Sequence, residues 1–176
     1  MLEAVEVSRL ESPPSRTFDC GRTMQNTFFC ERSYNDQEDR LSTTYTFEVH
    51  GITAAFATIC MDSIPLSRAE RGRTIPYSWI SALKLVQLGV DHRFQSAGLG
   101  RWAVAYVVDL AIELGVRVGC RYVTLDAQPE LEAWYTDQGF VRNHLRQEQR
   151  IDDAIMHRRD PASLPVSMRY DLRRAA

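Results

Sequence analysis

A glycine-punctuated segment between an apolar strand and an apolar helix constrains the fold of this chain more than any other feature. The segment is Gln95-Ser96-Ala97-Gly98-Leu99-Gly100. The run before it, residues 82–90, is short and rich in branched apolar residues, which is typical of a buried strand. The run after it, from Arg101 to Val116, has the length and the apolar periodicity of a helix. The sequence therefore predicts a strand, a loop and a helix in that order.

This arrangement is suited to binding an anion. Glycine lets the backbone approach a ligand closely, and the start of a helix presents unpaired N–H groups together with about half a positive charge. The spacing Gln-x-x-Gly-x-Gly differs from the Gly-x-Gly-x-x-Gly of dinucleotide folds and lacks the Gly-Lys-Ser/Thr ending of a P-loop. The amides of residues 95–101 are therefore candidate phosphate contacts, with Arg93 and Arg101 as candidate charged partners.

Length and composition predict one globular domain over residues 1–176. The net charge of −2 argues against a surface devoted to nucleic acid. The cysteines are widely spaced and no histidine pair has metal-ligand spacing, so we expect free thiols and no metal site. No window has the length of a membrane span, and the N-terminal residues lack the pattern of a signal peptide. We therefore expect a cytoplasmic protein with no membrane partner.

The rest of the chain predicts further strands and helices around this unit. Before the glycine segment we expect a strand within residues 4–10, one or two short helices within 23–39, and a hairpin of strands 43–50 and 53–61. After it we expect a strand at 122–125, a helix at 130–137 ended by Gly139, and short strands at 140–142 and 166–172. Residues 65–76 and 144–165 are predicted to be loops, the second also being compatible with a lid or a dimer contact. Antiparallel strands followed by a β-α-β unit indicate an α+β fold.

Four segments in this order resemble the GNAT superfamily of acetyl-CoA-dependent N-acyltransferases. Leu88-Gly89-Val90-Asp91 is similar to the end of the family's central strand, and residues 94–101 are similar to its pyrophosphate loop. Thr124-Leu125-Asp126-Ala127 is similar to its next strand, and residues 133–140 contain its Tyr-x-x-x-Gly-Phe element as Tyr135, Gly139 and Phe140. The resemblance covers residues 82–142. It implies a mostly antiparallel mixed sheet of about seven strands, splayed at the central strand and flanked by about four helices.

The resemblance also implies site residues. The coenzyme pyrophosphate is expected on the backbone of Gln95, Ser96, Ala97, Gly98, Leu99, Gly100 and Arg101, and the pantetheine arm along Leu88, Gly89 and Val90 as an added strand. Tyr135 is expected to protonate the departing thiolate, because the ordinary pKa values of a phenol and a thiol, about 10 and about 8.5, are close enough for this transfer. The general base stays open between Asp126, Glu70, Asp62 and a water chain, with Asp126 preferred for its position at the end of a strand.

The N-terminal part carries a second, narrower resemblance. Phe18-Asp19-Cys20-Gly21, followed by Asn26 and Phe28-Phe29, is similar to the start of GNAT toxins from bacterial toxin–antitoxin pairs. That branch acetylates the amino group of aminoacyl-tRNA and is silenced by a ribbon-helix-helix antitoxin. Two features depart from it: the segment 34–40 is net acidic and the whole chain is slightly negative, whereas phosphate contacts supply most of the affinity for nucleic acid.

Three functions follow from the sequence. The first is direct transfer of an acetyl group from acetyl-CoA to a primary amine in a ternary complex, without an acyl-enzyme, because the site motifs contain no cysteine. The second is a toxin that acetylates aminoacyl-tRNA and binds an antitoxin. The third is a non-catalytic module that binds coenzyme A. A small-molecule amine and aminoacyl-tRNA are both compatible acceptors, and a homodimer is compatible with each function.

Overall fold

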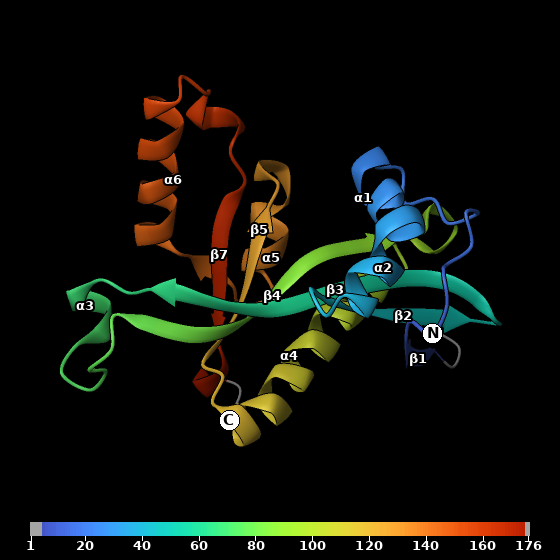
Figure 1. Ribbon diagram of the computed structural model, residues 1–176, viewed down its shortest axis with the longest axis horizontal. Coiled ribbons are helices and arrows are strands. Elements are labelled where there is room, and N and C mark those ends of the chain that lie inside the picture. The colour runs from blue at the N-terminus through green and yellow to red at the C-terminus, as the bar shows by residue number, and fades with distance from the viewer. Residues whose placement is uncertain (1–4, 175–176) are drawn as a thin grey trace. The chain divides into compact units, whose positions relative to one another are not determined.

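The computed structural model describes residues 5–174, which fall into two compact units. Among the described residues, the first unit comprises 5–60 and 85–110, and the second comprises 61–84 and 111–174. The chain passes from one unit to the other within β3 (Ile52–Pro65), β4 (Trp79–Val90) and α4 (Leu99–Val118), all labelled in Figure 1. That both units act as the one domain predicted over residues 1–176 stays a prediction.

The first unit is built on antiparallel strands. β1 (Glu6–Arg9) pairs with β2 (Thr43–Val49), and β2 pairs with β3. His50 and Gly51 have φ values of 53° and 72° and form the two-residue turn between β2 and β3, in the conformation that suits a tight hairpin. The segment between β1 and β2 forms α1 (Thr23–Thr27), a π-helical turn (Phe28–Arg32) and α2 (Ser33–Glu38).

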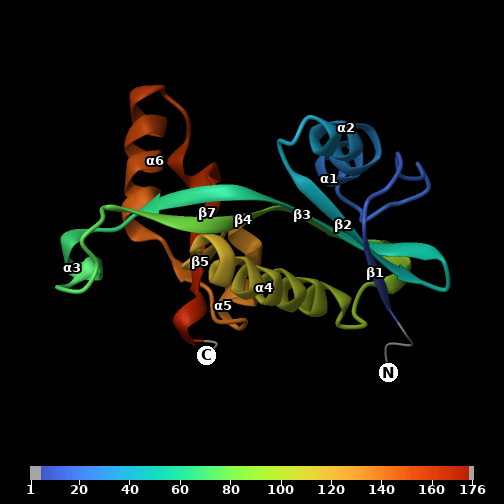
Figure 2. The same ribbon diagram turned by 60° about the horizontal axis from the view of Figure 1, so that its bottom comes forward.

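Aromatic side chains form much of the core of the first unit. The rings of Phe29 and Phe56 are stacked with centroids 4.3 Å apart, and Phe18 meets both rings edge-on. Phe47 lies on the face of the sheet opposite to Phe56. Its register partner is the residue before Phe56, and successive side chains of a strand point to opposite faces. There it packs edge-on against Trp102 near the start of α4, the helix labelled in Figure 2.

The second unit is built on β5 (Tyr122–Ala127) and β7 (Val166–Asp171), which pair antiparallel along their length. β6 (Val141–Arg142) adds to the other edge of β7. Its helices are α3 (Arg68–Arg71), α5 (Glu132–Thr136) and α6 (His144–Met156). A buried apolar cluster joins the end of β3, the start of β4 and β5; its members are Ile64, Leu66, Ile80, Ala82 and Tyr122.

The strand order within residues 5–174 is β1-β2-β3-β4-β5-β7-β6 in one seven-stranded sheet. β4 and β5 are neighbours joined through α4 and form the one parallel pair of the described strands. The predicted α+β fold with a mostly antiparallel mixed sheet is confirmed. The β-α-β unit around the glycine segment is confirmed as well, with its strand beginning at Trp79 and its helix ending at Val118.

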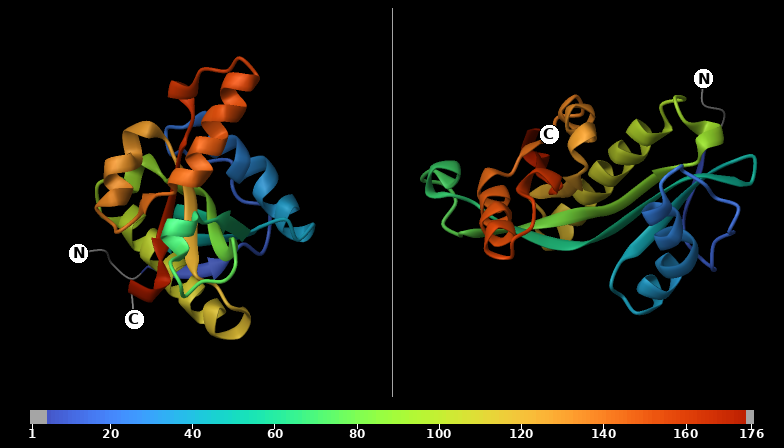
Figure 3. Two further views of the ribbon diagram at one scale, coloured as in Figure 1. Left: turned by 90° about the vertical axis from the view of Figure 1, so that its left-hand side faces the viewer. Right: turned by 90° about the horizontal axis from the view of Figure 1, so that it is seen from above.

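Two segments predicted to be loops contain helices, so that part of the prediction was wrong. α3 begins with a capping box, in which Ser67 and Glu70 exchange side-chain and backbone hydrogen bonds. α6 fills residues 144–156 and lies beside β7, as the left view of Figure 3 shows. Only Ala154 of α6 is buried, and the half-buried residues beside it include the polar Gln147 and Arg150, so the covered face of this helix does not read as a continuous apolar run.

The other predicted elements are present with ends moved by a few residues. The strand predicted within residues 4–10 corresponds to β1, although residue 4 lies outside the described residues. The prediction on a signal peptide concerns the N-terminal residues, of which the first four also lie outside them. Within residues 5–174, no helix combines the length and the apolar character needed to cross a membrane.

Candidate functional site

The predicted phosphate loop joins the end of β4 to the start of α4. Asp91 caps a short 3₁₀ helix (His92–Phe94) by accepting a hydrogen bond from the Arg93 amide at 3.0 Å. After Gln95, Ser96 and Gly98 take positive φ values of 65° and 84°. Residues 95–98 are exposed, whereas Leu99 is buried and anchors the first turn of α4.

This loop presents the amino end of a twenty-residue helix to solvent. The Trp102 amide donates to the Gly98 carbonyl at 3.1 Å, so the amides of Leu99, Gly100 and Arg101 precede this first bond of the helix. Amides in this position, with the positive end of the helix dipole, bind phosphate groups. A Cβ added at Gly98 would meet no atom within 4 Å, so it is the positive φ, and not a lack of space, that favours glycine there. The loop 95–98 and the first turn of α4 thus form one continuous segment with the geometry of an anion site.

The strand end that precedes the loop is closely packed. A Cβ added at Gly89 would lie 2.5 Å from Cε1 of Phe56, so the Phe56 ring packs directly on the backbone of β4. Leu88 and Val90 are partly buried on either side of Gly89. The Val90 carbonyl accepts a hydrogen bond from Nε2 of Gln95 at 3.0 Å. Packing against Phe56 therefore accounts for the glycine at position 89.

Arg93, a candidate phosphate partner, is paired with a carboxylate next to it in the chain. Its Nε and Nη2 donate to Oδ1 and Oδ2 of Asp91 at 2.8 and 2.9 Å. The Asp91 side chain is fully buried, and the hydrogen bonds from Arg93 lower the pKa of Asp91 to about 2 against the opposing effect of burial. Arg93 therefore neutralises a buried charge, and this contact fixes the turn that leads into the loop.

The predicted general acid lies in α5, in the second unit. Tyr135 is 8% exposed, and its ring meets those of Trp134 and Phe140 at centroid distances of 4.8 and 5.8 Å. Gly139 ends the helix with a φ of 90°, and the Phe140 amide donates to the Tyr135 carbonyl at 3.2 Å. A Cβ at Gly139 would lie 2.9 Å from the ring of Tyr170. The Tyr-x-x-x-Gly-Phe spacing therefore forms one tight turn that holds the Tyr135 ring among aromatic neighbours.

Asp126, the preferred candidate base, lies between two cations. Nζ of Lys84 is 2.7 Å from its Oδ2, and Nη1 of Arg150 is 2.7 Å from its Oδ1. Burial raises the pKa of Asp126, but the hydrogen bonds from Arg150 and Lys84 outweigh it and hold this pKa below its usual range. A carboxylate with a lowered pKa is a weaker proton acceptor. These contacts favour a role for Asp126 in holding Lys84 and Arg150.

The other two candidate bases are paired in the same way. Asp62 accepts from Oγ1 of Thr124 and Nη1 of Arg146, both at 2.7 Å. Glu70 accepts from Arg169 and from the Ser67 amide. For both carboxyl groups burial raises the pKa, and the hydrogen bonds then lower it below its ordinary value. The geometry therefore singles out none of the three carboxylates as the proton acceptor.

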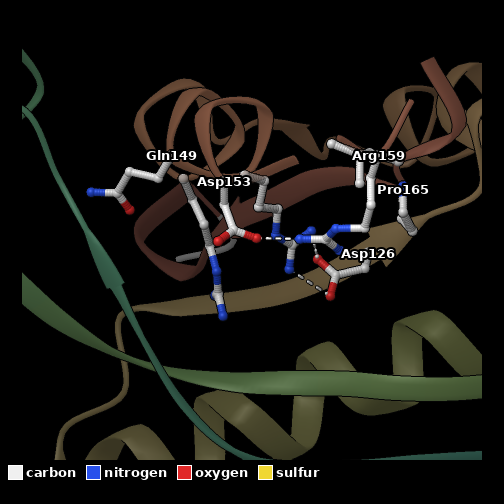
Figure 4. Close-up of a pocket in the computed structure, with 8 residues that line it drawn as sticks. Asp126, Gln149, Asp153, Arg159 and Pro165 are labelled. Carbon is white, nitrogen blue, oxygen red and sulfur yellow. Dashed lines mark hydrogen bonds and ion pairs between the residues drawn. The ribbon is translucent and has the colours of Figure 1, made fainter. Parts of the chain in front are cut away.

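A cavity of about 460 Å³ lies beside Asp126 in the second unit (Figure 4). Its volume falls in the range of small-molecule sites. Figure 4 shows Asp126, Asp153 and Arg159 turned toward one another in this space. Its lining residues are Asp126, Arg146, Gln149, Arg150, Asp153, Arg159, Leu164 and Pro165.

The arginines of this cavity were missed by sequence reasoning. Arg146 and Arg150 come from α6, which was predicted to be a loop, and Arg159 follows that helix. The four-residue spacing of Arg146 and Arg150, which puts both on one helix face, was the available signal. Each guanidinium is paired with a carboxylate: Asp62, Asp126 and Asp153 respectively.

Within residues 5–174, no group of three histidine, cysteine or acidic side chains is arranged to hold a metal ion. The four cysteines form no disulfide within the described residues. Burial raises the pKa of the thiols of Cys20, Cys30 and Cys120, which disfavours the reactive thiolate.

Comparison with known proteins places this fold among solved structures of toxins. No family model and no curated protein matches the chain. A bacterial toxin is 17% identical with a TM-score of 0.78, over 97% of this chain and 92% of its own. AtaT complexed with acetyl-methionyl-tRNAfMet is 19% identical with a TM-score of 0.72, over 79% and 88%. A tyrosine-to-phenylalanine AtaT mutant bound to the C-terminus of the antitoxin AtaR and acetyl-CoA is 13% identical with a TM-score of 0.73, over 98% and 96%.

At these identities the similarity establishes a shared fold. The chain has the fold of these toxins along nearly its whole length. The GNAT-like fold implied by the two sequence resemblances, including that of the N-terminal part, is therefore confirmed.

Proposed function

We propose that this chain is an acetyl-CoA-dependent N-acetyltransferase that transfers the acetyl group directly to a primary amine. The observation that carries the proposal is the exposed loop with Ser96 and Gly98 at positive φ, which opens onto the amino end of a twenty-residue helix. The shared fold supports the same ligand, because structures of this fold include AtaT with its antitoxin bound to acetyl-CoA.

In this proposal the coenzyme is held mainly by backbone. The amides of residues 95–101 bind the pyrophosphate, and Leu88, Gly89 and Val90 take the pantetheine arm. The amine nitrogen attacks the thioester carbonyl, a C–N bond forms and the C–S bond breaks. Tyr135 donates its hydroxyl proton to the departing thiolate and regains a proton from solvent, and the proton lost by the amine passes to solvent. Asp126 positions Lys84 and Arg150 rather than accepting that proton.

The test is a coenzyme A release assay over a panel of amines, together with acetyl-CoA binding by calorimetry. Tyr135→Phe should lower kcat by about a hundred- to ten-thousandfold and leave the Kd for acetyl-CoA unchanged, because only the proton donor is removed. Tyr170→Phe is the matched control, since its ring packs against Phe140 at 5.5 Å in the same aromatic group. A Tyr135→Phe enzyme as active as the wild type would contradict the assigned role.

The same assay tests the loop. Gly98→Glu should abolish acetyl-CoA binding, because it adds a side chain at a positive φ and a negative charge where the pyrophosphate binds. Gly119→Glu places the same side chain at a φ of 75° in open space in the second unit and should bind normally. Binding without release of coenzyme A from any amine would instead indicate a coenzyme A-binding module.

Aminoacyl-tRNA is a second candidate acceptor. It is favoured by one comparison: AtaT with acetyl-methionyl-tRNAfMet shares this fold. The partner would then be an antitoxin, as AtaR is for AtaT, and the ribbon-helix-helix type and the homodimer stay predictions. Aminoacyl-tRNA added to the amine panel separates this acceptor from small amines. Expression of the wild type should then arrest growth, and Tyr135→Phe should relieve the arrest.

A further inference from the structure

The N-terminal loop Phe18–Gly21 is hydrogen bonded to the segment that begins the glycine loop, more than seventy residues later. The Asp19 amide donates to Oδ2 of Asp91 at 3.2 Å. The His92 amide donates to the Asp19 carbonyl at 2.8 Å, and Nε2 of Gln95 donates to the Cys20 carbonyl at 3.1 Å. All of these residues belong to the first unit.

Asp91 is the centre of these contacts. Its fully buried carboxylate accepts from the Asp19 amide, the Arg93 amide and the Arg93 guanidinium, so both oxygens are occupied. A buried carboxylate left without these donors would cost free energy. The hydrogen bonds therefore favour the arrangement in which the N-terminal loop and the 3₁₀ helix both contact Asp91. Asp91 therefore links the N-terminal loop to the 3₁₀ helix that leads into the glycine loop.

Gln95 forms the second link. Its Nε2 donates to the Cys20 carbonyl and also to the Val90 carbonyl at 3.0 Å, which uses both N–H groups of the side chain. The side-chain amide of Gln95 thus links the glycine loop to both the end of β4 and the N-terminal loop. The side chain of the first residue of the Gln-x-x-Gly-x-Gly motif therefore fixes the start of the glycine loop through hydrogen bonds.

The N-terminal loop is itself held on two sides. Oδ1 of Asp19 accepts from the Gly21 amide at 2.8 Å and from Nδ2 of Asn26 at 2.7 Å, and these bonds lower the pKa of Asp19. The Cys20 amide donates to Oδ1 of Asn26 in α1 at 2.9 Å. Phe18 packs edge-on against Phe56, the ring that covers Gly89. Polar and apolar contacts therefore fix the same loop against the end of β4.

We propose that the loop Phe18–Gly21 is a positioning element for the coenzyme A loop and acts through Asp91 and Gln95. By holding residues 91–95, it pre-orders the amides of residues 96–101 before any ligand arrives. A ligand that binds a pre-ordered loop loses less conformational entropy on binding, so its affinity is higher. The assignment of the ligand rests on the proposed function, whereas the ordering of the loop does not.

The test compares two glutamine variants of the first unit. Gln95→Met keeps the length of the side chain and removes both donors. Gln37→Met is the matched control, because Gln37 also bridges two backbone groups, the Leu10 carbonyl and the Thr44 amide, away from the glycine loop. The measurements are the acetyl-CoA Kd, the melting temperature and the hydrogen exchange of a peptide covering residues 95–101.

Gln95→Met should weaken acetyl-CoA binding about tenfold and speed exchange of the 95–101 amides in the ligand-free protein. Gln37→Met should lower the melting temperature and leave both of these readouts unchanged. Asp19→Ala, which loosens the N-terminal loop without touching the glycine loop, should reproduce the faster exchange at residues 95–101. This third variant separates positioning by the N-terminal loop from a local effect at Gln95.

The outcomes are distinct. Wild-type exchange at 95–101 in Asp19→Ala would overturn positioning by the N-terminal loop, whatever Gln95→Met does and whatever the ligand is. If amide exchange is faster in Gln95→Met and Asp19→Ala but the wild-type protein binds no acetyl-CoA, the positioning role stands and the proposed function is overturned. Equal loss of acetyl-CoA affinity in Gln37→Met and Gln95→Met would show that general destabilisation is the cause, and it too would overturn the proposal.

Discussion

At the scale of single residues, Gly89 shows how one packing contact determines which amino acid can occupy a position in the first unit. Phe56 is fully buried, stacks on Phe29 and lies directly over the backbone at position 89. The ring is enclosed, so it cannot move aside to make room for another atom. A sequence pattern shows the glycine, but it does not show the ring that requires it.

Gly89→Ala is therefore expected to lower the free energy of unfolding by about 1–3 kcal/mol, because the new methyl group overlaps Phe56. Urea denaturation measures the change. In a Phe56→Leu background the same substitution should cost much less, since the ring edge is gone. Additive effects of the two substitutions would rule out the contact as the cause.

The sequence could predict how some candidate site residues are arranged but not how others are, for a physical reason. Tyr135, Gly139 and Phe140 lie in one turn, so their spacing along the chain is enough to predict that they lie close together. The roles of the Asp91 and Gln95 side chains depend on partners 72 and 75 residues away. Local pattern carries no information on such contacts, and only the folded chain reveals them.

At the scale of elements, α6 is held by polar contacts. Arg146 and Arg150 pair with Asp62 and Asp126, and the Ser167 amide donates to Oε1 of Gln147 at 2.7 Å. The strands and α4 could be predicted because their buried faces are apolar and periodic. α6 could not, because the partners of its charges lie on β3 and β5.

Raising NaCl from about 0.05 to 1 M should speed hydrogen exchange in α6 and leave the first unit unaffected, because salt weakens partly exposed ion pairs. Arg150→Gln should produce a similar three- to tenfold increase at low salt, equivalent to about 1 kcal/mol. Arg117→Gln, an exposed position in α4, is the control. Exchange in α6 that responds to neither change would mean that these ion pairs do not hold the helix.

At the scale of the whole molecule, carboxylates with lowered pKa values occur in both units. In the first unit, hydrogen bonds from Arg93 hold the pKa of Asp91 at about 2. In the second, Asp62, Asp126 and Asp171 have pKa values below the ordinary one, where hydrogen bonds from arginine outweigh burial. A carboxyl group whose pKa is lower in the folded state stabilises the fold above its unfolded pKa. That contribution is lost as the pH falls toward the folded pKa.

For Asp91 this window runs from about pH 4 down to about pH 2. The free energy of unfolding should stay level between pH 7 and 5, then fall below pH 4, with about 2 kcal/mol of the loss due to Asp91. Asp91→Asn should flatten this acid slope, and Asp152→Asn on the exposed side of α6 should not. Parallel slopes in the wild type and Asp91→Asn would refute the assignment.

The passage of β3, β4 and α4 from one unit to the other has a consequence for how the protein is made. A ribosome delivers the N-terminal loop first, but the buried carboxylate that binds Asp19 is 72 residues further along the chain. Residues 61–84 of the second unit emerge in between. The first unit therefore cannot be completed during synthesis until part of the second has already left the ribosome, and no single cut of the gene yields either unit whole.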